Sequence, residues 1–202
     1  MSPARVKSSA RTSLLTVVLS LTAALAGCAP AAEPPLAGSD IGGPFELTDS
    51  TGKTVRWSDF AGQYRIVYFG FTYCPDVCPT DVQRMSQGLS AFERGAPELA
   101  AKVQPIFISV DPERDTPAVV GEFIANFHPR LIGLTGTPEQ VQTAVANFAA
   151  FAETGEPAKD GSYMVNHSTV TVLFGPDGEP LASLPTDQGA EAVAAELATW
   201  VS

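Results

Sequence analysis

The chain has 202 residues, of which 45% are hydrophobic, and its formal net charge is −10. This length and composition predict one compact domain with a substantial core, plus a terminal segment. The acidic balance excludes nucleic acids and anionic lipid surfaces as electrostatic partners, because both require a basic footprint.

The first 27 residues contain three basic residues, no acidic residue and an apolar run over residues 14–26. This run is shorter than the roughly 20 residues of a membrane-spanning helix and predicts an export signal. It ends in Leu-Ala-Gly before Cys28, which looks like the lipobox of bacterial lipoproteins and implies cleavage there and lipidation of the Cys28 thiol. We therefore expect a lipoprotein signal peptide over residues 1–27 and an extracytoplasmic location on a bacterial cell membrane. An uncleaved anchor is the alternative.

An Ala-, Pro- and Gly-rich stretch without periodicity follows the apolar run. Such composition is typical of a linker, so we expect the lipidated cysteine and a flexible linker over residues 28–42. One domain is then expected over residues 43–202.

The domain begins with two strand signals. Residues 45–57 alternate around an Asp-Ser-Thr-Gly turn and predict a hairpin. Residues 65–71 are nearly continuously apolar, which predicts a central parallel strand buried on both faces. An apolar helical spacing then starts at Pro79.

The second half alternates further strands and helices. They are a strand over 103–110, a helix from Pro117, a strand over 131–134, a helix from a capping box at Thr137, a hairpin of strands 168–174 and 181–184, and a helix over 190–201. This order predicts an α/β fold, a thioredoxin-like mixed-sheet sandwich with an N-terminal hairpin and a helical segment inserted before the final hairpin.

Cys74 and Cys78 lie between the central strand and the following helix. If Cys78 caps a helix that begins at Pro79, nearby backbone N–H groups favour both thiolates. Helical spacing also places the two Cα atoms about 6 Å apart, within the range of a disulfide. The pair is therefore predicted to be reactive or metal-binding, with a structural disulfide as the alternative.

The sequence contains two histidines. His128 ends a predicted helix before Pro129 and is interpreted as a surface residue. His167 directly precedes a strand that a thioredoxin-like sheet places beside the cysteine loop. Two thiolates and one imidazole suit copper, and zinc accepts the same donors.

The domain resembles the Sco (SenC/PrrC) family of copper-binding, thioredoxin-like proteins. The resemblance extends from residue 43 to the C-terminus and rests on residues 69–79 (FGFTYCPDVCP), 109–117 (SVDPERDTP) and 165–168 (VNHS). It implies one copper ion, Cu(I) or Cu(II), held by Cys74, Cys78 and His167. It also implies a copper chaperone for the binuclear copper centre of cytochrome c oxidase.

The implied partner is the copper-centre subunit of that oxidase, with other periplasmic copper carriers and thiol reductants as further candidates. The alternative function is a thiol–disulfide oxidoreductase that reduces the oxidase cysteines, or a redox sensor. Whether the protein is an enzyme therefore stays open, with the chaperone favoured. Thioredoxin-like oxidoreductases carry a cis-proline beside their cysteines, whereas Thr169 falls near that place here, which favours copper.

Asp111 and Asp115 follow the second central strand in a loop that should border the site. They are candidates for orienting His167 or for placing negative charge beside the metal. The alternative is turn and cap chemistry, with Asp115 or Thr116 capping the helix from Pro117.

Overall fold

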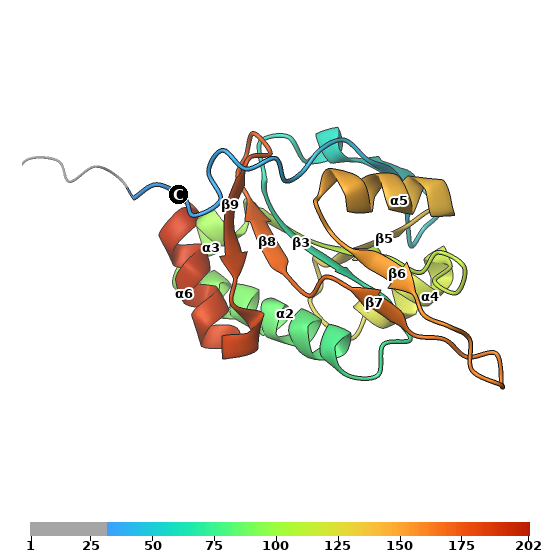
Figure 1. Cartoon of the computed structure of the whole chain (residues 1–202). Coiled ribbons are helices and arrows are strands. Elements are labelled where there is room, and N and C mark those ends of the chain that lie inside the picture. The colour runs from blue at the N-terminus through green and yellow to red at the C-terminus, as the bar shows by residue number, and fades with distance from the viewer. Residues whose placement is uncertain (1–31) are drawn as a thin grey trace, which may run out of the picture. The chain divides into compact units, whose positions relative to one another are not determined.

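The computed structural model describes residues 32–202, so Cys28 and the expected signal peptide lie outside the described residues. Residues Pro34–Ser202 form one compact unit (Figure 1). Its first residues belong to it structurally, because the Leu36 N–H donates to the Leu181 carbonyl and the Gly42 N–H donates to the Asn147 carbonyl. Part of the expected linker therefore packs on the domain. Among the described residues, no helix combines the length and apolar character needed to cross a membrane.

A seven-stranded mixed sheet forms the centre of the fold, with the strand order β2-β1-β5-β4-β3-β8-β9. Its strands are β1 (Glu46–Asp49), β2 (Thr54–Arg56), β3 (Tyr64–Gly70), β4 (Val103–Ser109), β5 (Ile132–Thr135), β8 (Thr171–Phe174) and β9 (Pro180–Leu184). β3, β4 and β5 run parallel, and the other pairs are antiparallel. The mixed sheet and the N-terminal hairpin of β1 and β2 are confirmed.

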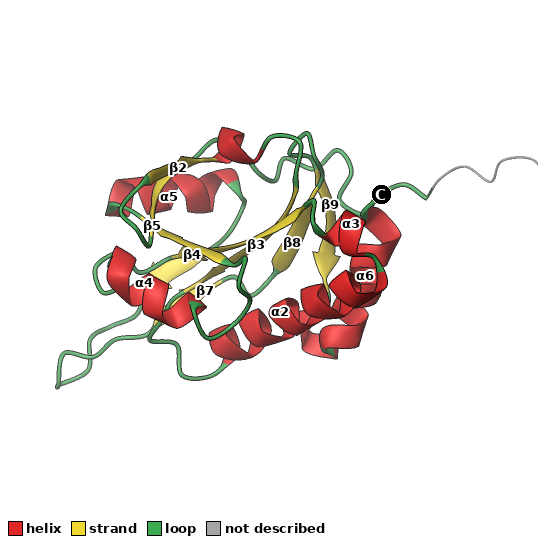
Figure 2. Cartoon of the chain, turned by 180° about the vertical axis from the view of Figure 1, so that it is seen from behind, coloured by secondary structure: helices red, strands yellow, loops and turns green. Residues whose placement is uncertain are grey.

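Helices cover both faces of the sheet (Figures 1 and 2). One face packs against α2 (Val77–Gly95), α4 (Pro117–Ile124) and α6 (Ala190–Trp200), and α3 (Pro97–Ala100) follows α2. The other face packs against α5 (Pro138–Asn147) and the N-terminal segment. Strand β3 is buried along its whole length because it has both neighbouring strands and both helical layers around it.

The two faces of β3 carry different cores. On the α2 side, Tyr68 stacks against Phe107 with ring centroids 6.4 Å apart. On the α5 side, Phe69 meets Phe148 at 5.6 Å. Because side chains alternate along a strand, neighbouring residues of β3 serve opposite layers.

A second, two-stranded sheet consists of β6 (Ala152–Thr154) and β7 (Val165–His167). In its antiparallel register, Ala152 lies opposite His167. This pair of strands was not predicted, and the next strand was expected to begin at Ser168, although β8 begins at Thr171. The expected helical insertion before the final hairpin is confirmed as α5, and Thr137 and Gln140 form its capping box.

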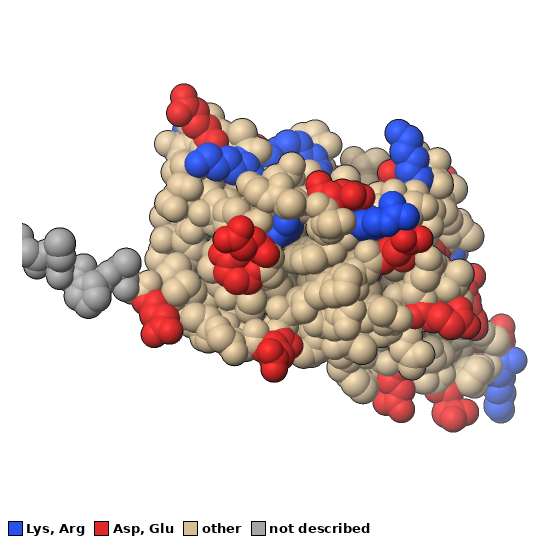
Figure 3. Space-filling view, turned by 90° about the horizontal axis from the view of Figure 1, so that it is seen from above, with Lys and Arg blue, Asp and Glu red and all other residues tan. Residues whose placement is uncertain are grey.

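Acidic and basic side chains are interspersed on the face seen from above (Figure 3). No continuous basic stripe crosses that view, in agreement with the acidic composition. Most of the visible surface is neither acidic nor basic.

Candidate metal centre

The cysteine pair lies where β3 leaves the sheet. β3 ends at Gly70, and a loop then leads into α2, whose first residue is Val77. Cys78 is therefore in the first turn of the helix, which begins two residues before the predicted start at Pro79. Its backbone N–H donates to the Cys74 sulfur at 3.5 Å, so the helix start faces Cys74.

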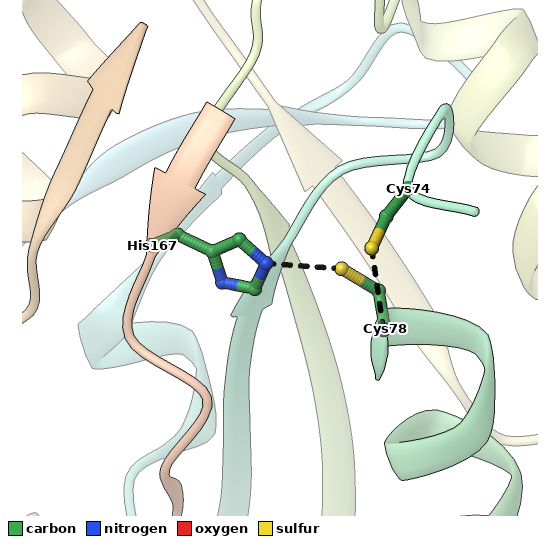
Figure 4. A group of neighbouring side chains, drawn as sticks. All are labelled: Cys74, Cys78 and His167. Atoms are coloured by element: carbon green, nitrogen blue, oxygen red, sulfur yellow. Dashed lines mark hydrogen bonds between the residues drawn. The ribbon is translucent and has the colours of Figure 1, made fainter. Parts of the chain in front are cut away.

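His167 approaches the same place from the end of β7 (Figure 4). Its Nε2 lies 3.1 Å from the Cys78 sulfur. Its Nδ1 lies 2.7 Å from the Ser168 carbonyl oxygen, which can only accept a hydrogen bond. Nδ1 therefore carries the proton in the neutral ring, and Nε2 presents its lone pair to the cysteines.

The Cys74 and Cys78 sulfurs and a ring nitrogen of His167 all lie within 4.8 Å of one another. The described structure thus brings together the three residues that the sequence singled out. Both cysteines are free thiols, with Cys78 buried and Cys74 half-buried. Two sulfurs and one imidazole nitrogen at this separation fit a soft metal ion after small side-chain adjustments.

Gly70 provides the space behind the sulfur of Cys78. A Cβ at this position would lie 2.8 Å from Cε1 of Tyr68 and 3.3 Å from the Cys78 sulfur. Any other residue would push the tyrosine ring or the thiol away. The close packing of Tyr68 and Cys78 therefore requires a glycine at the end of β3.

Burial raises the pKa of the Cys78 thiol to about 12, and a hydrogen bond with Cys74 acts in the same direction. The expectation that the helix start favours both thiolates is wrong for Cys78, because desolvation outweighs the hydrogen bonds with the Phe71 backbone and the Tyr68 side chain that lower its pKa. In the metal-free protein this thiol is neutral and shares its proton with His167 Nε2. A metal ion must therefore displace that proton.

Tyr68 is a site residue that the sequence analysis treated only as part of a buried strand. It is fully buried, and its hydroxyl bonds with Asp81 at 3.3 Å and with Cys78. Its ring also stands edge-on to His167, with centroids 6.3 Å apart. A tyrosine in the middle of a strand predicted to be buried was the available signal, because a buried tyrosine needs a polar partner.

Asp115 holds the cysteine loop in place through hydrogen bonds. Its carboxylate accepts hydrogen bonds from the Thr72 N–H at 2.9 Å, the Thr72 hydroxyl at 2.6 Å and the Ser109 hydroxyl at 2.6 Å. Burial raises the pKa of Asp115 in spite of these bonds. The carboxylate holds the loop that carries Cys74, and Thr116 caps α4.

Asp111 belongs to a neighbouring cluster. It accepts from the Tyr163 hydroxyl at 2.8 Å and pairs with Arg114 at 2.5 Å. The Arg114 guanidinium lies 3.6 Å from the Tyr163 ring centroid. Neither Asp111 nor Asp115 contacts His167, whose Nδ1 bonds to Ser168 instead. The suggested orientation of His167 by these carboxylates is therefore absent in this structure.

His128 lies away from the metal-site candidates and is buried, with 4% of its surface exposed. The interpretation as a surface residue is wrong. Its Nε2 lies 3.3 Å from Glu93, which also bonds Arg130 at 2.5 Å. This cluster ties the end of α2 to the loop before β5.

A family model described as SCO1/SenC matches residues 33–202, which include the whole cysteine and histidine site. The chain belongs to the SCO1/SenC family. The resemblance drawn from the three sequence motifs is thereby confirmed, and so is the thioredoxin-like fold class, which the Sco structures share.

Individual relatives agree with this membership. The human mitochondrial SCO1 homolog is 38% identical over 161 residues, covering 79% of this chain and 52% of the relative. A zebrafish SCO2 homolog is 43% identical, covering 67% of this chain and 48% of the relative. The chain thus spans about half the length of the curated relatives it matches.

Solved structures cover most of the domain. ScoI of Bradyrhizobium japonicum with copper bound is 38% identical with a TM-score of 0.72, over 80% of this chain and 99% of that chain. BsSco, described as a member of the Sco family of cytochrome c oxidase assembly proteins, shares the fold at 22% identity with a TM-score of 0.62, over 83% of this chain and 97% of that chain.

The relatives correct the expected location. Curated relatives from human, zebrafish, yeast and Arabidopsis are named as mitochondrial proteins. The prediction of an extracytoplasmic lipoprotein on a bacterial cell membrane is therefore wrong. Its basis was a four-residue match at Cys28 after a basic, acid-free leader, and this leader composition is shared by more than one class of targeting signal.

Proposed function

We propose that this protein binds one copper ion through Cys74, Cys78 and His167 and delivers it to the copper-centre subunit of cytochrome c oxidase. The observation that carries the proposal is the approach of three donor atoms to within 4.8 Å of one another. The copper-bound family member with 38% identity over 80% of this chain supports the choice of copper. The family's description as oxidase assembly proteins supports the recipient.

The residues of this chain perform three tasks in the proposed delivery. The sulfurs of Cys74 and Cys78 supply soft donors, and the proton of the buried Cys78 thiol must leave as the metal binds. His167 completes the set through Nε2, because Ser168 fixes its other ring nitrogen. Cys74 is the less buried of the two cysteines, so a partner's ligand can replace it more readily than Cys78.

Anaerobic titration of the reduced domain with Cu(I) tests the proposal. We expect one tightly bound copper per chain, and a large loss of affinity in Cys74→Ser, Cys78→Ser and His167→Ala. His128→Ala is the matched histidine control, because His128 contacts Glu93 and not the cysteines. Binding that survives His167→Ala unchanged would sink the three-ligand site.

A dithiol reductant remains the second candidate function. It is favoured by the free state of both cysteines and by the N–H of Cys78 directed at the Cys74 sulfur, a geometry that supports a nucleophilic thiol. Reduction of an oxidised oxidase-subunit peptide by His167→Ala, at the rate of the unchanged protein, would favour this function. Loss of that reaction together with copper binding would instead link the two activities.

A further inference from the structure

The exposed apolar side chains of this domain are concentrated at the candidate metal centre. Five large hydrophobic residues are exposed in residues 32–202, each with at least 43% of its surface accessible. They are Tyr73, Val77, Phe151, Met164 and Val170. Tyr73 and Val77 adjoin the two cysteines in sequence, and Met164 and Val170 each lie three residues from His167. Phe151 is the remaining member.

Contacts connect the segments that carry these residues. The Phe151 N–H donates to the Ser168 hydroxyl at 2.7 Å, so Phe151 lies beside the residue that follows His167. Arg114 connects the cysteine loop with the segment before β7. Its guanidinium lies 5.1 Å from the Tyr73 ring and 3.6 Å from the ring of Tyr163, the neighbour of Met164. The apolar side chains thus continue from the cysteine loop to the β6–β7 sheet.

An apolar cavity of about 150 Å³ lies beside Val170, on the α5 side of the sheet. Its other lining residues include Val67, Phe69, Phe148 and Ala150. A cavity of this size and character accepts one aliphatic side chain from outside. A partner would therefore find both exposed apolar side chains and a pocket that can hold an anchoring side chain.

The segments that carry or flank the candidate ligands are rich in acidic residues. Asp76, Glu113, Glu153, Glu156 and Asp160 are all exposed on the segments that carry or flank the ligands, and Lys159 is the exposed base among them. Figure 3 shows acidic side chains prevailing at the lower right, the end of the molecule that carries the β6–β7 hairpin. A partner with a basic border complements this charge.

We propose that Tyr73, Val77, Phe151, Met164 and Val170 form a docking face for the copper acceptor, a protein whose own metal site lies in an apolar patch bordered by Lys and Arg. This inference rests on the proposed function. Cys78 has no exposed surface, so an acceptor ligand reaches the copper only after close contact around the site. Apolar contact supplies that approach and excludes water, and the acidic border speeds the encounter.

The test uses the full domain loaded with Cu(I) and the reduced, metal-free copper-centre domain of the oxidase subunit from the same organism. Met164→Gln combined with Val170→Thr replaces two exposed apolar side chains by polar ones of similar size. We expect unchanged copper stoichiometry and affinity, and a second-order transfer rate reduced about tenfold, the size of a modest interface hot spot. Stopped-flow mixing measures the transfer.

A second pair of variants tests whether the acidic residues speed the encounter with the partner. Asp76→Asn with Glu153→Gln should slow transfer at low salt and flatten its dependence on ionic strength. Glu98→Gln, in α3 beyond the far end of α2, removes one negative charge away from the site and, as the control, should leave both unchanged. A transfer rate that rises with salt would overturn the basic border of the partner.

The outcomes separate the docking face from the proposed function. If the unchanged protein binds and transfers copper, and Met164→Gln/Val170→Thr transfers equally fast, the docking face is wrong and copper delivery stands. If the unchanged protein holds copper but transfers none to the oxidase domain, both are wrong. If it binds no copper, the proposed function fails first, and the docking face for a copper acceptor fails with it.

Discussion

Cys74 and Cys78 share one turn of chain and have different chemical surroundings. Cys78 is fully buried with a pKa of about 12, whereas Cys74 is half-buried and accepts a backbone N–H. The two sulfurs therefore do different work. Cys78 is held in place by the core, and Cys74 faces the reagents and partners that reach the site.

Timed alkylation of the reduced native domain near pH 8 should label Cys74 much faster than Cys78. The physical reason is that Cys78 combines no solvent access with a raised pKa, and only the thiolate reacts. Peptide mass spectrometry measures the two rates, and unfolding in denaturant should bring them together. Equal rates in the native protein would contradict the assignment.

Tyr68→Phe should affect the site while preserving the aromatic packing. Removing the hydroxyl deprives the buried Asp81 carboxylate and the Cys78 sulfur of a hydrogen bond. We expect a loss of stability of about 1–2 kcal/mol. The Tyr68 bond lowers the Cys78 pKa against burial, so its loss should raise that pKa further and shift Cys78 alkylation to higher pH.

Tyr64→Phe is the matched control for this variant. Tyr64 lies at the opposite end of the same strand, where its hydroxyl interacts with Ser202. Denaturation should show at most a small loss of stability, and the alkylation profile of Cys78 should not move. A shift in Tyr64→Phe as well would mean that the effect comes from the strand and not from the site.

At the level of elements, the cysteine loop depends on a contact with the segment after β4. Thr72→Val removes one of the bonds to the buried Asp115 carboxylate while keeping the side-chain shape. We expect a loss of about 1–3 kcal/mol in denaturation and weaker copper binding, because the loop carries Cys74. Thr51→Val, which breaks an exposed Thr–Asp bond in the β1–β2 turn, should cost less and leave copper binding unchanged.

The end of α2 is joined to the loop before β5 by Glu93, Arg130 and His128. Burial alone would raise the pKa of Glu93, but its bonds to Arg130 and His128 prevail and lower it below its usual value. Stability from this carboxylate is therefore present above the ordinary glutamate pKa and lost as pH falls through the lower, folded value.

Glu93→Gln should consequently destabilise the domain at neutral pH by about 0.5–1 kcal/mol, a modest amount because Glu93 is partly exposed. The difference should shrink at acidic pH, as the native carboxyl becomes protonated. Urea denaturation at the two pH values measures it. An equal difference at both would show that Glu93 acts through packing and not through its charge.

Elements with a strong local pattern were predictable. The β1–β2 hairpin follows from alternation around a turn, and α5 follows from the Thr137 capping box. β6 was missed because Ala152–Thr154 is short and mostly exposed, so no hydrophobic period marks it. The burial of His128 was also missed, since its partner Glu93 lies 35 positions away in the sequence.

At the scale of the whole molecule, the candidate site brings together residues that are far apart in the sequence. Cys78 and His167 are 89 positions apart in sequence, and their side chains meet at 3.1 Å. Their meeting was predicted from the thioredoxin-like strand order and from the family resemblance, because residue spacing alone does not fix where distant strands pair. The energetic consequence is that a bound ion would cross-link two distant segments.

Cu(I) should therefore raise the melting temperature of the reduced domain. An ion in hundredfold excess over its dissociation constant adds about 2.7 kcal/mol when only the folded state binds it. Anaerobic calorimetry should show this gain reversed by a cuprous chelator and much reduced in His167→Ala. A gain of full size in His167→Ala would indicate that the cysteines alone hold the ion.

The two sheets contribute unequal numbers of donor residues to this centre. Both cysteines follow directly from β3, in the middle of the seven-stranded sheet, whereas His167 belongs to the two-stranded β6–β7 sheet. The third donor is thus carried by a separate sheet, and a substitution at His167 could exchange imidazole for another donor while leaving the dithiol in place. Metal preference and redox chemistry can in this way evolve separately within one fold.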